Sequence, residues 1–192
     1  YDITRGTLNP GDTLVVIDDS IVRGTTLRES IVTMLTKLEP ARIVVASSAP
    51  PILYPDCYGI DMSQLGRFIG FEAAIALLAE RRMDRVLDEV EARCRAQAEL
   101  PADRMRNEVR AIYDPFTLDE LSAKVADLIR TPGLAWRGRL DVLYQSVPGL
   151  HAAMPRFTGD WYFTGEYPTP GGYKVLNTAF LNWRRGDERR AY

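Results

Sequence analysis

The clearest apolar run of this chain covers residues 14–17. It reads Leu-Val-Val-Ile and lies between Gly11-Asp12 and the acidic pair Asp18-Asp19. A continuous apolar run of this length between turn residues is typical of a strand buried on both faces, as in a parallel sheet. We therefore predict a short buried strand that ends at two carboxylates.

A helical pattern follows this strand. Apolar residues recur three and four positions apart from residue 27 to residue 38, and the pattern stops before Pro40. Thr26 and Glu29 have the spacing of a capping box, which predicts that the helix begins directly after Thr26. Residues 42–47 predict a second buried strand. A strand, a helix and a strand in this order predict parallel strands joined by a right-handed crossover, and hence an α/β fold with part of a doubly wound sheet.

Helical spacing returns from residue 63 to residue 100. Acidic and basic residues alternate at its end, so we interpret this part as a solvated helix face with pairs such as Glu91–Arg95. A boundary is expected near Leu100 and Pro101, which divides the chain into residues 1–100 and residues 101–192.

The second part is predicted to be mainly helical and irregular. Thr117 and Glu120 form another capping box, and the helix that follows runs to about Arg130. Residues 140–145 resemble a strand, and the segment after them is rich in glycine, proline and aromatic residues. His151 lies there between apolar neighbours, and we give it a structural role rather than a catalytic one.

Composition narrows the classes of function. The chain has 192 residues, 46% of them hydrophobic, with 24 basic and 26 acidic residues and a net charge of −2. We expect a globular protein without a nucleic-acid or membrane partner, because no global charge attracts an anionic surface and no apolar run could span a bilayer. A cytoplasmic location is expected. Cys57 and Cys94 have no ligand-like spacing, so we expect reduced thiols.

Candidate chemistry gathers where the first strand ends. Ligands of open α/β sheets bind beyond the carboxyl ends of the strands, which is where Asp18 and Asp19 stand. Residues 24–26, Gly-Thr-Thr, open the next helix, and backbone N–H groups at a helix start bind phosphate. Paired carboxylates bind sugar hydroxyls or Mg²⁺. A strand, an acidic turn and a helix also occur in α/β proteins without a ligand, but the three features together favour a ribose 5-phosphate that carries pyrophosphate.

The same residues carry a resemblance to a known family. VVIDDSIVRGTT resembles the phosphoribosyl diphosphate (PRPP) motif of type I phosphoribosyltransferases. Its residues DDSIVRGTT are similar to those of the glutamine amidophosphoribosyltransferase family of purine biosynthesis. SSAPPILYPDCYGIDM, residues 47–62, resembles the segment after the next strand in that family, and DWYFTGEYPTPGG with a closing RAY resembles one of its subgroups. The resemblance implies part of a doubly wound type I phosphoribosyltransferase domain in residues 1–100 and a C-terminal extension in residues 101–192.

The resemblance also implies an activity. In this family ammonia from glutamine attacks C1 of PRPP and displaces pyrophosphate, which gives 5-phosphoribosylamine. Asp18 and Asp19 correspond to the catalytic carboxylates and to ligands of Mg²⁺. The implied PRPP-binding residues are Asp18, Asp19, Ser20, Arg23, Gly24, Thr25 and Thr26.

Two further expectations come from the family. Its glutaminase domain and the front half of its transferase domain precede the motif, so we expect Tyr1 to begin a C-terminal fragment that is inactive with glutamine alone and derives from a homo-oligomer. Members with an iron–sulfur cluster use four cysteines, and Gly159 and Tyr162 stand where two of them would be. With two cysteines in total, no such cluster is expected.

Two other functions stay open at this point. A phosphoribosyltransferase of the same fold could act on a free base, and the chain upstream of Tyr1 would decide between the two reactions. A non-catalytic PRPP or nucleotide sensor would need a DNA-binding module with a basic face.

Overall fold

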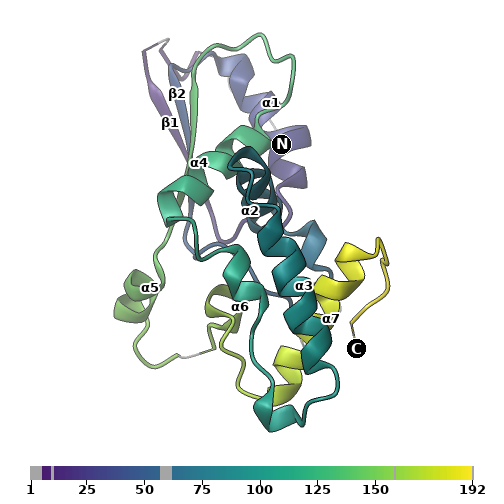
Figure 1. Ribbon diagram of the computed structural model, residues 1–192. Coiled ribbons are helices and arrows are strands. Elements are labelled where there is room, and N and C mark those ends of the chain that lie inside the picture. Colours follow the sequence, from purple (N-terminus) through teal and green to yellow (C-terminus); the bar gives the residue numbers. More distant parts are fainter. Residues whose placement is uncertain (1–5, 10, 57–61, 158, 192) are drawn as a thin grey trace.

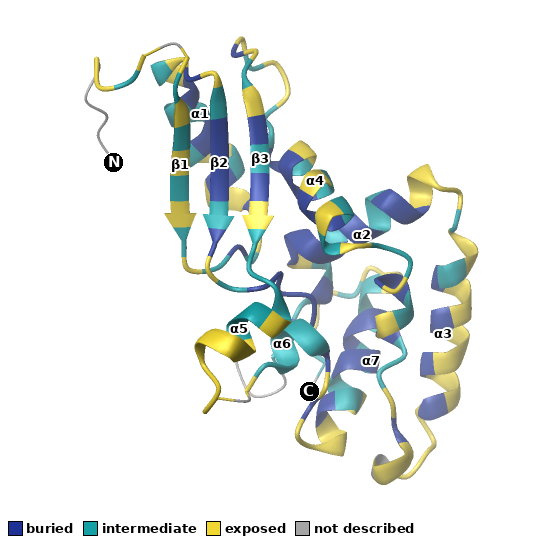
Figure 2. Cartoon of the chain, turned by 90° about the vertical axis from the view of Figure 1, so that its left-hand side faces the viewer, coloured by how far each residue is buried: buried dark blue, intermediate teal, exposed yellow. Residues whose placement is uncertain are grey.

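The computed structural model describes residues 6–9, 11–56, 62–157 and 159–191. Three strands, β1 (Thr13–Asp18), β2 (Arg42–Ser47) and β3 (Arg139–Tyr144), form one parallel sheet in the order β1-β2-β3. The first two are labelled in Figure 1, and Figure 2 shows all three side by side. Asp18, Ser47 and Tyr144 are register partners at the carboxyl end of the sheet. The predicted α/β class with a parallel sheet is confirmed.

The prediction that the first strand is buried on both faces is wrong. Val15 is 55% exposed and Ile17 is 79% exposed, and Leu143 on β3 shares their face of the sheet at 54%. Figure 2 shows helices beyond the strands and, among the described residues, none in front of them. Both crossovers move in the same direction across the sheet, and right-handed crossovers then place their helices on the same face.

The first crossover helix has the predicted range but a different start. It comprises a π-turn, η1 (Leu27–Ile31), then α1 (Val32–Leu35) and a 3₁₀ turn, η2 (Thr36–Leu38), and it ends where Glu39 takes a positive φ of 52°. The predicted Thr26 capping box is wrong. Thr26 already has helical dihedrals of −62° and −39°, and its side chain makes no capping hydrogen bond. An N-cap needs an extended backbone to direct its hydroxyl at the following N–H groups.

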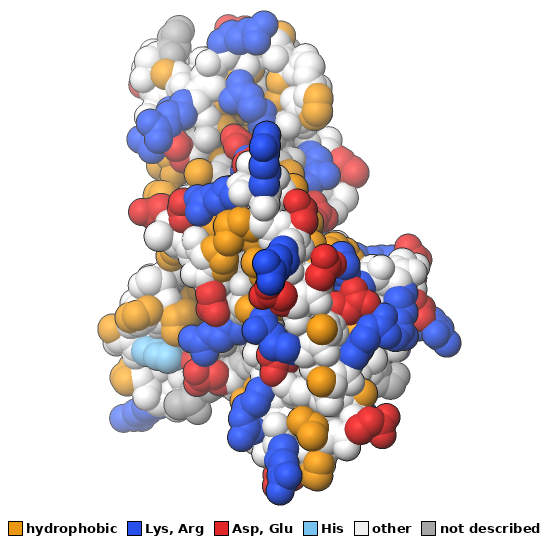
Figure 3. All heavy atoms as spheres, viewed as in Figure 1, with side chains coloured by type: hydrophobic (Ala, Val, Ile, Leu, Met, Phe, Trp, Pro, Cys, Tyr) orange, Lys and Arg blue, Asp and Glu red, His pale blue; other side chains and the backbone are white. Residues whose placement is uncertain are grey.

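The second crossover is longer, and its first part forms two helices where the sequence suggested one helical region. A 3₁₀ turn, η3 (Leu65–Arg67), leads into α2 (Ile69–Glu80), and α3 (Arg85–Gln97) follows. The chain turns between them, and Arg82 in this turn has a φ of +56°. The predicted Glu91–Arg95 pair forms on α3, with Arg95 Nε 3.1 Å from Glu91 Oε1. Acidic and basic side chains lie interspersed on the face that Figure 3 shows.

Short elements bring the chain from α3 back to the sheet. They are η4 (Ala102–Arg104), η5 (Val109–Ile112) and α4 (Leu118–Ile129), which packs against β3. After β3 come α5 (Val147–Ala153), α6 (Trp161–Thr164) and α7 (Pro170–Arg184), and α7 lies along α3. One core joins these elements, with its largest fully buried side chains at Phe68, Phe71, Phe180, Ile43, Leu65 and Ile69.

The sheet and the core both draw on residues from either side of position 100. β3 completes a sheet begun by β1 and β2, and α7 packs on α3. The division into residues 1–100 and 101–192 stays a prediction. No helix within the described ranges combines the length and the apolar character that crossing a membrane requires.

The capping box at Thr117 is confirmed, and it gives a test of local stability. Thr117 Oγ1 accepts from the Glu120 N–H, and the Glu120 carboxylate accepts from the Thr117 N–H at 2.8 Å. We expect Thr117→Ala to lower the free energy of unfolding by about 1 kcal/mol in urea denaturation. Thr26→Ala, which removes no cap, is the matched control and should stay within about 0.5 kcal/mol of the parent chain. Equal losses in both variants would contradict the assignment.

Glu120 should make part of this stability depend on pH. The hydrogen bond from the Thr117 backbone, followed by the Arg81 guanidinium, lowers the pKa of Glu120 from 4.5 to about 2. A lowered pKa stabilises the fold above the unfolded value, so this contribution is complete above about pH 4.5 and is lost as the pH falls towards 2. Glu120→Gln, which has no carboxylate to titrate, should therefore show a smaller loss of stability over this pH range than the parent chain.

Candidate functional site

A hollow of about 650 Å³ opens at the carboxyl end of β1. The hollow is lined by the end of the strand, the following turn and the start of the first helix. One further lining residue comes from a distant loop. The lining residues are Asp18, Ser20, Ile21, Val22, Arg23, Gly24, Thr25, Thr26, Leu27 and Met62. Six of the seven residues predicted to bind PRPP therefore meet in one hollow, and Asp19 does not line it.

The two carboxylates are held by backbone N–H groups. Asp18 Oδ1 accepts from the Asp19 N–H at 2.9 Å, and Asp19 Oδ1 accepts from the Ser20 N–H at 2.7 Å. These bonds direct each carboxylate along the turn and use one oxygen of each, so the second oxygen can meet a ligand. Among the described residues no cluster of three or more potential metal-ligand side chains occurs, and carboxylate oxygens are donors that Mg²⁺ accepts.

The loop after β2 braces the acidic turn. The Ser48 N–H donates to the Asp18 carbonyl at 2.9 Å, and the Ala49 N–H donates to the Asp19 carbonyl at 3.1 Å. Ser48 Oγ also lies 3.2 Å from the Asp19 carbonyl oxygen. The turn that carries both acids is therefore bonded to the neighbouring strand's loop rather than to residues of its own helix.

Gly24 forms the corner on the other side of the hollow. Its φ is +66°, and a Cβ atom there would lie 2.2 Å from Ile69 Cδ1. Only glycine combines this left-handed conformation with so close an approach. The first helical hydrogen bond runs from the Arg28 N–H to the Gly24 carbonyl at 2.9 Å. The N–H groups of Thr25 and Thr26 precede it and have no acceptor within the helix, so they are donors for an anion.

Sequence reasoning missed the residues that support this corner. Met62 lines the hollow from the end of the Ser47–Met62 segment, and the Ile69 N–H donates to the Val22 carbonyl at 2.9 Å. Ile129 also packs against Gly24. The resemblance of the Ser47–Met62 segment was the only signal for Met62, and no local pattern indicated Ile69 or Ile129. Cys57 and residues 58–61 lie outside the described residues.

The remaining candidates lie away from the hollow. Burial raises the pKa of the Cys94 thiol to about 12, so the thiol stays protonated near neutral pH. His151 Nε2 is 2.7 Å from Asp160 Oδ2 on the surface, which agrees with a structural role. Gly159 and Tyr162, which stand where two cluster cysteines of the family would be, both lie within the described residues. The Tyr162 carbonyl accepts hydrogen bonds from the Leu53 and Tyr54 N–H groups.

The parallel sheet makes the chain an α/β protein, and the paired acids at a strand end and the glycine corner are consistent with part of a phosphoribosyltransferase-type domain. Curated relatives that match parts of the chain are named amidophosphoribosyltransferase, and the resemblance to that family is confirmed over the matched part. No family model matches the chain.

Three relatives illustrate the similarity. The protein from Haemophilus influenzae is 43% identical over 67 residues, which are 35% of this chain and 13% of that protein. The protein from Bacillus subtilis is 53% identical over 53 residues, or 28% of this chain and 11% of the relative. The protein from Saccharomyces cerevisiae is 38% identical over 82 residues, which are 40% of this chain and 16% of that relative. The matched part is thus between a tenth and a sixth of the length of these relatives.

Proposed function

We propose that the hollow binds PRPP and that the protein containing this chain is an amidophosphoribosyltransferase. It would displace pyrophosphate from PRPP with ammonia derived from glutamine and form 5-phosphoribosylamine. One observation carries the proposal: Asp18 and the corner of residues 24–26 line the same hollow. The names of the relatives favour this transferase over one that acts on a free base.

The residues of the hollow have distinct roles in this proposal. The N–H groups and hydroxyls of Thr25 and Thr26, together with Ser20 and Arg23, bind the 5-phosphate, because a helix start and hydroxyl donors favour an anion. Gly24 lets the phosphate approach the backbone closely. Asp18 binds the ribose hydroxyls from the strand end.

The carboxylates also account for the expected metal ion. Asp18 and Asp19 would hold Mg²⁺ through the oxygens that their backbone hydrogen bonds do not use, either directly or through water. When bound, the ion supplies charge stabilisation for the departing pyrophosphate. Positive charge develops at C1 of the ribose during transfer, and the negative field of the two carboxylates stabilises it. Positioning and electrostatics then supply the catalysis without a strong base.

Calorimetric titration of the 192-residue chain tests the site directly. We expect PRPP with Mg²⁺ to bind at least about tenfold more tightly than ribose 5-phosphate or pyrophosphate alone, because only PRPP contacts both sides of the hollow. Chelation of Mg²⁺ should weaken binding. Equal affinity for PRPP and pyrophosphate, or no binding of PRPP, would refute the proposal. In the full-length protein the corresponding readout is formation of pyrophosphate that depends on glutamine or ammonia.

A further inference from the structure

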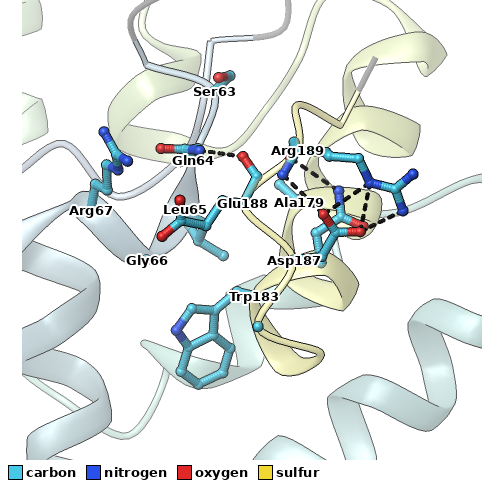
Figure 4. Close-up of a pocket in the computed structure, with 12 residues that line it drawn as sticks. Ser63, Gln64, Leu65, Gly66, Arg67, Ala179, Trp183, Asp187, Glu188 and Arg189 are labelled. Atoms are coloured by element: carbon cyan, nitrogen blue, oxygen red, sulfur yellow. Dashed lines mark hydrogen bonds and ion pairs between the residues drawn. The ribbon is translucent and has the colours of Figure 1, made fainter.

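The C-terminal end of the chain folds back against the turn that leads to the proposed site. Helix α7 ends at Arg184, and Gly186, with a φ of +67°, donates its N–H to the Trp183 carbonyl at 3.0 Å. The Asp187 N–H donates to the Asn182 carbonyl at 2.9 Å. These bonds reverse the chain, so that residues 187–189 run beside η3 and enclose a hollow of about 300 Å³ with it (Figure 4).

Side chains lock this reversed segment in place. The Asp187 carboxylate accepts from the Arg189 N–H at 3.0 Å and from its guanidinium Nη2 at 2.6 Å. Asn182 Nδ2 donates to the Arg189 carbonyl at 3.3 Å. Gln64 Nε2, from the residue before η3, donates to the Glu188 carbonyl, and the dashed line in Figure 4 marks this bond. The last of these ties the tail to a segment more than a hundred residues earlier.

Trp183 supports the same turn. Its indole lies so close to Gly66 that a Cβ atom on Gly66 would be 2.5 Å from Trp183 Cδ1. The indole also packs edge-on against Phe71 of α2, with ring centroids 4.8 Å apart. Leu65 and Phe68, on either side of this contact, are each 1% exposed. The turn is therefore held by Trp183 and by the tail.

The turn is also connected to the corner of the proposed site. It leads directly into Ile69, the first residue of α2, whose side chain fills the space beside Gly24 and whose N–H holds the Val22 carbonyl. Met62, two residues before Gln64, lines the hollow itself. A continuous series of packed and hydrogen-bonded residues thus joins the tail to the Val22–Gly24 corner.

We propose that Trp183 and residues 186–189, here called the C-terminal brace, position the Val22–Gly24 corner for PRPP through Gln64, Gly66 and Ile69. Gln64 and Trp183 are positioning residues in this proposal, because neither lines the hollow at β1. The identity of the ligand in this inference rests on the proposed function. The structural connection between the brace and the Val22–Gly24 corner does not depend on that function.

Two variants test the brace. One chain ends at Arg185 and so lacks residues 186–192, and the other carries Gln64→Ala, which removes a single hydrogen bond and should leave the fold intact. Arg184→Ala is the matched control. Arg184 lies at the same end of α7, but it pairs with Asp88 and Glu91 on α3 at 2.6 and 2.8 Å, away from η3.

The first measurement is amide hydrogen exchange without ligand. We expect the Ile69 and Arg28 amides, which bond to Val22 and Gly24, to exchange about tenfold faster in both brace variants, since each lost hydrogen bond weakens the corner by up to this factor. The Val45 amide in β2 and the Arg184→Ala chain should match the parent chain. Unchanged exchange at Ile69 and Arg28 in the Gln64→Ala chain would overturn the proposal.

The second measurement separates the brace from the proposed function. Calorimetry should show PRPP with Mg²⁺ binding about tenfold more weakly to Gln64→Ala than to Arg184→Ala, with the same midpoint of thermal unfolding. Faster exchange in the brace variants, together with a parent chain that does not bind PRPP, would support the brace and refute the proposed ligand. Equal PRPP affinity in the two variants would overturn the link between the brace and the site.

Discussion

Replacing both Asp18 and Asp19 with asparagine is expected to weaken binding of PRPP with Mg²⁺ by about a thousandfold. Hydrogen bonds to charged groups contribute about 1.5–3 kcal/mol each, and the double variant removes both carboxylates that the proposal assigns to the ribose hydroxyls and the metal ion. Asparagine keeps an oxygen that can accept the 2.9 and 2.7 Å bonds from the Asp19 and Ser20 N–H groups. The free energy of unfolding should therefore change by less than about 1 kcal/mol.

Calorimetry of the 192-residue chain gives the affinity, and urea denaturation gives the stability. Asp12→Asn is the matched control, because Asp12 precedes the opposite end of β1 and its carboxylate accepts from the Asn9 N–H at 2.8 Å. It should leave PRPP affinity unchanged. In the full-length protein the double variant should abolish phosphoribosyl transfer. Retained affinity or turnover in the Asp18 and Asp19 variant would remove the carboxylates from the proposed site.

Gly24→Ala is expected to lower stability strongly for the addition of one methyl group, because a positive φ and a close buried neighbour coincide there. The left-handed backbone costs a residue with a side chain about 1–2 kcal/mol, and overpacking of a core costs about 1–3 kcal/mol. The added Cβ would meet Ile69 Cδ1 at 2.2 Å and Ile129 Cγ2 at 3.3 Å, and Ile69 is fully buried. We expect the free energy of unfolding to fall by about 3 kcal/mol in total.

Two comparisons divide this loss between conformation and packing. Gly133 has a φ of +83° with nothing within 4 Å of its added Cβ, so Gly133→Ala should lose the conformational part alone. Ile69→Val removes the atom that the new Cβ would meet, so a double-mutant cycle of Gly24→Ala with Ile69→Val should show favourable coupling. The clash assignment is wrong if Gly24→Ala and Gly133→Ala lose the same stability and the cycle shows no coupling.

Sequence patterns predicted an element correctly where the stabilising side-chain hydrogen bonds join residues within one helical turn. The Thr117–Glu120 capping box and the helix after it are present, because all of its bonds join residues three positions apart. Thr26 and Glu29 have the same spacing but no cap forms. The Gly24 corner already sets Thr26 in a helical conformation, and that corner is held by Ile69, 45 positions further on.

The site shows the same division. Asp18 and residues 24–26 could be recognised from the sequence because a strand end and a helix start are adjacent along the chain. Met62 and Ser48 come from distant loops, and their place beside the hollow follows from the pairing of β1 with β2. Asp19 was grouped with Asp18, but successive side chains at a strand end diverge, and only Asp18 lines the hollow.

The sequence by itself determined the strand, helix and strand order over residues 13–47, the parallel pairing of β1 and β2, and the chemical groups at the end of β1. These depend on residue periodicity and on neighbours within a few positions. Only the tertiary structure decided that Val15 and Ile17 lie on an uncovered face, that β3 completes the sheet, and that the C-terminal brace reaches the turn before Ile69. These three features depend on which surfaces pack together between segments far apart in the sequence. The packing of the whole core determines this, and no single segment does.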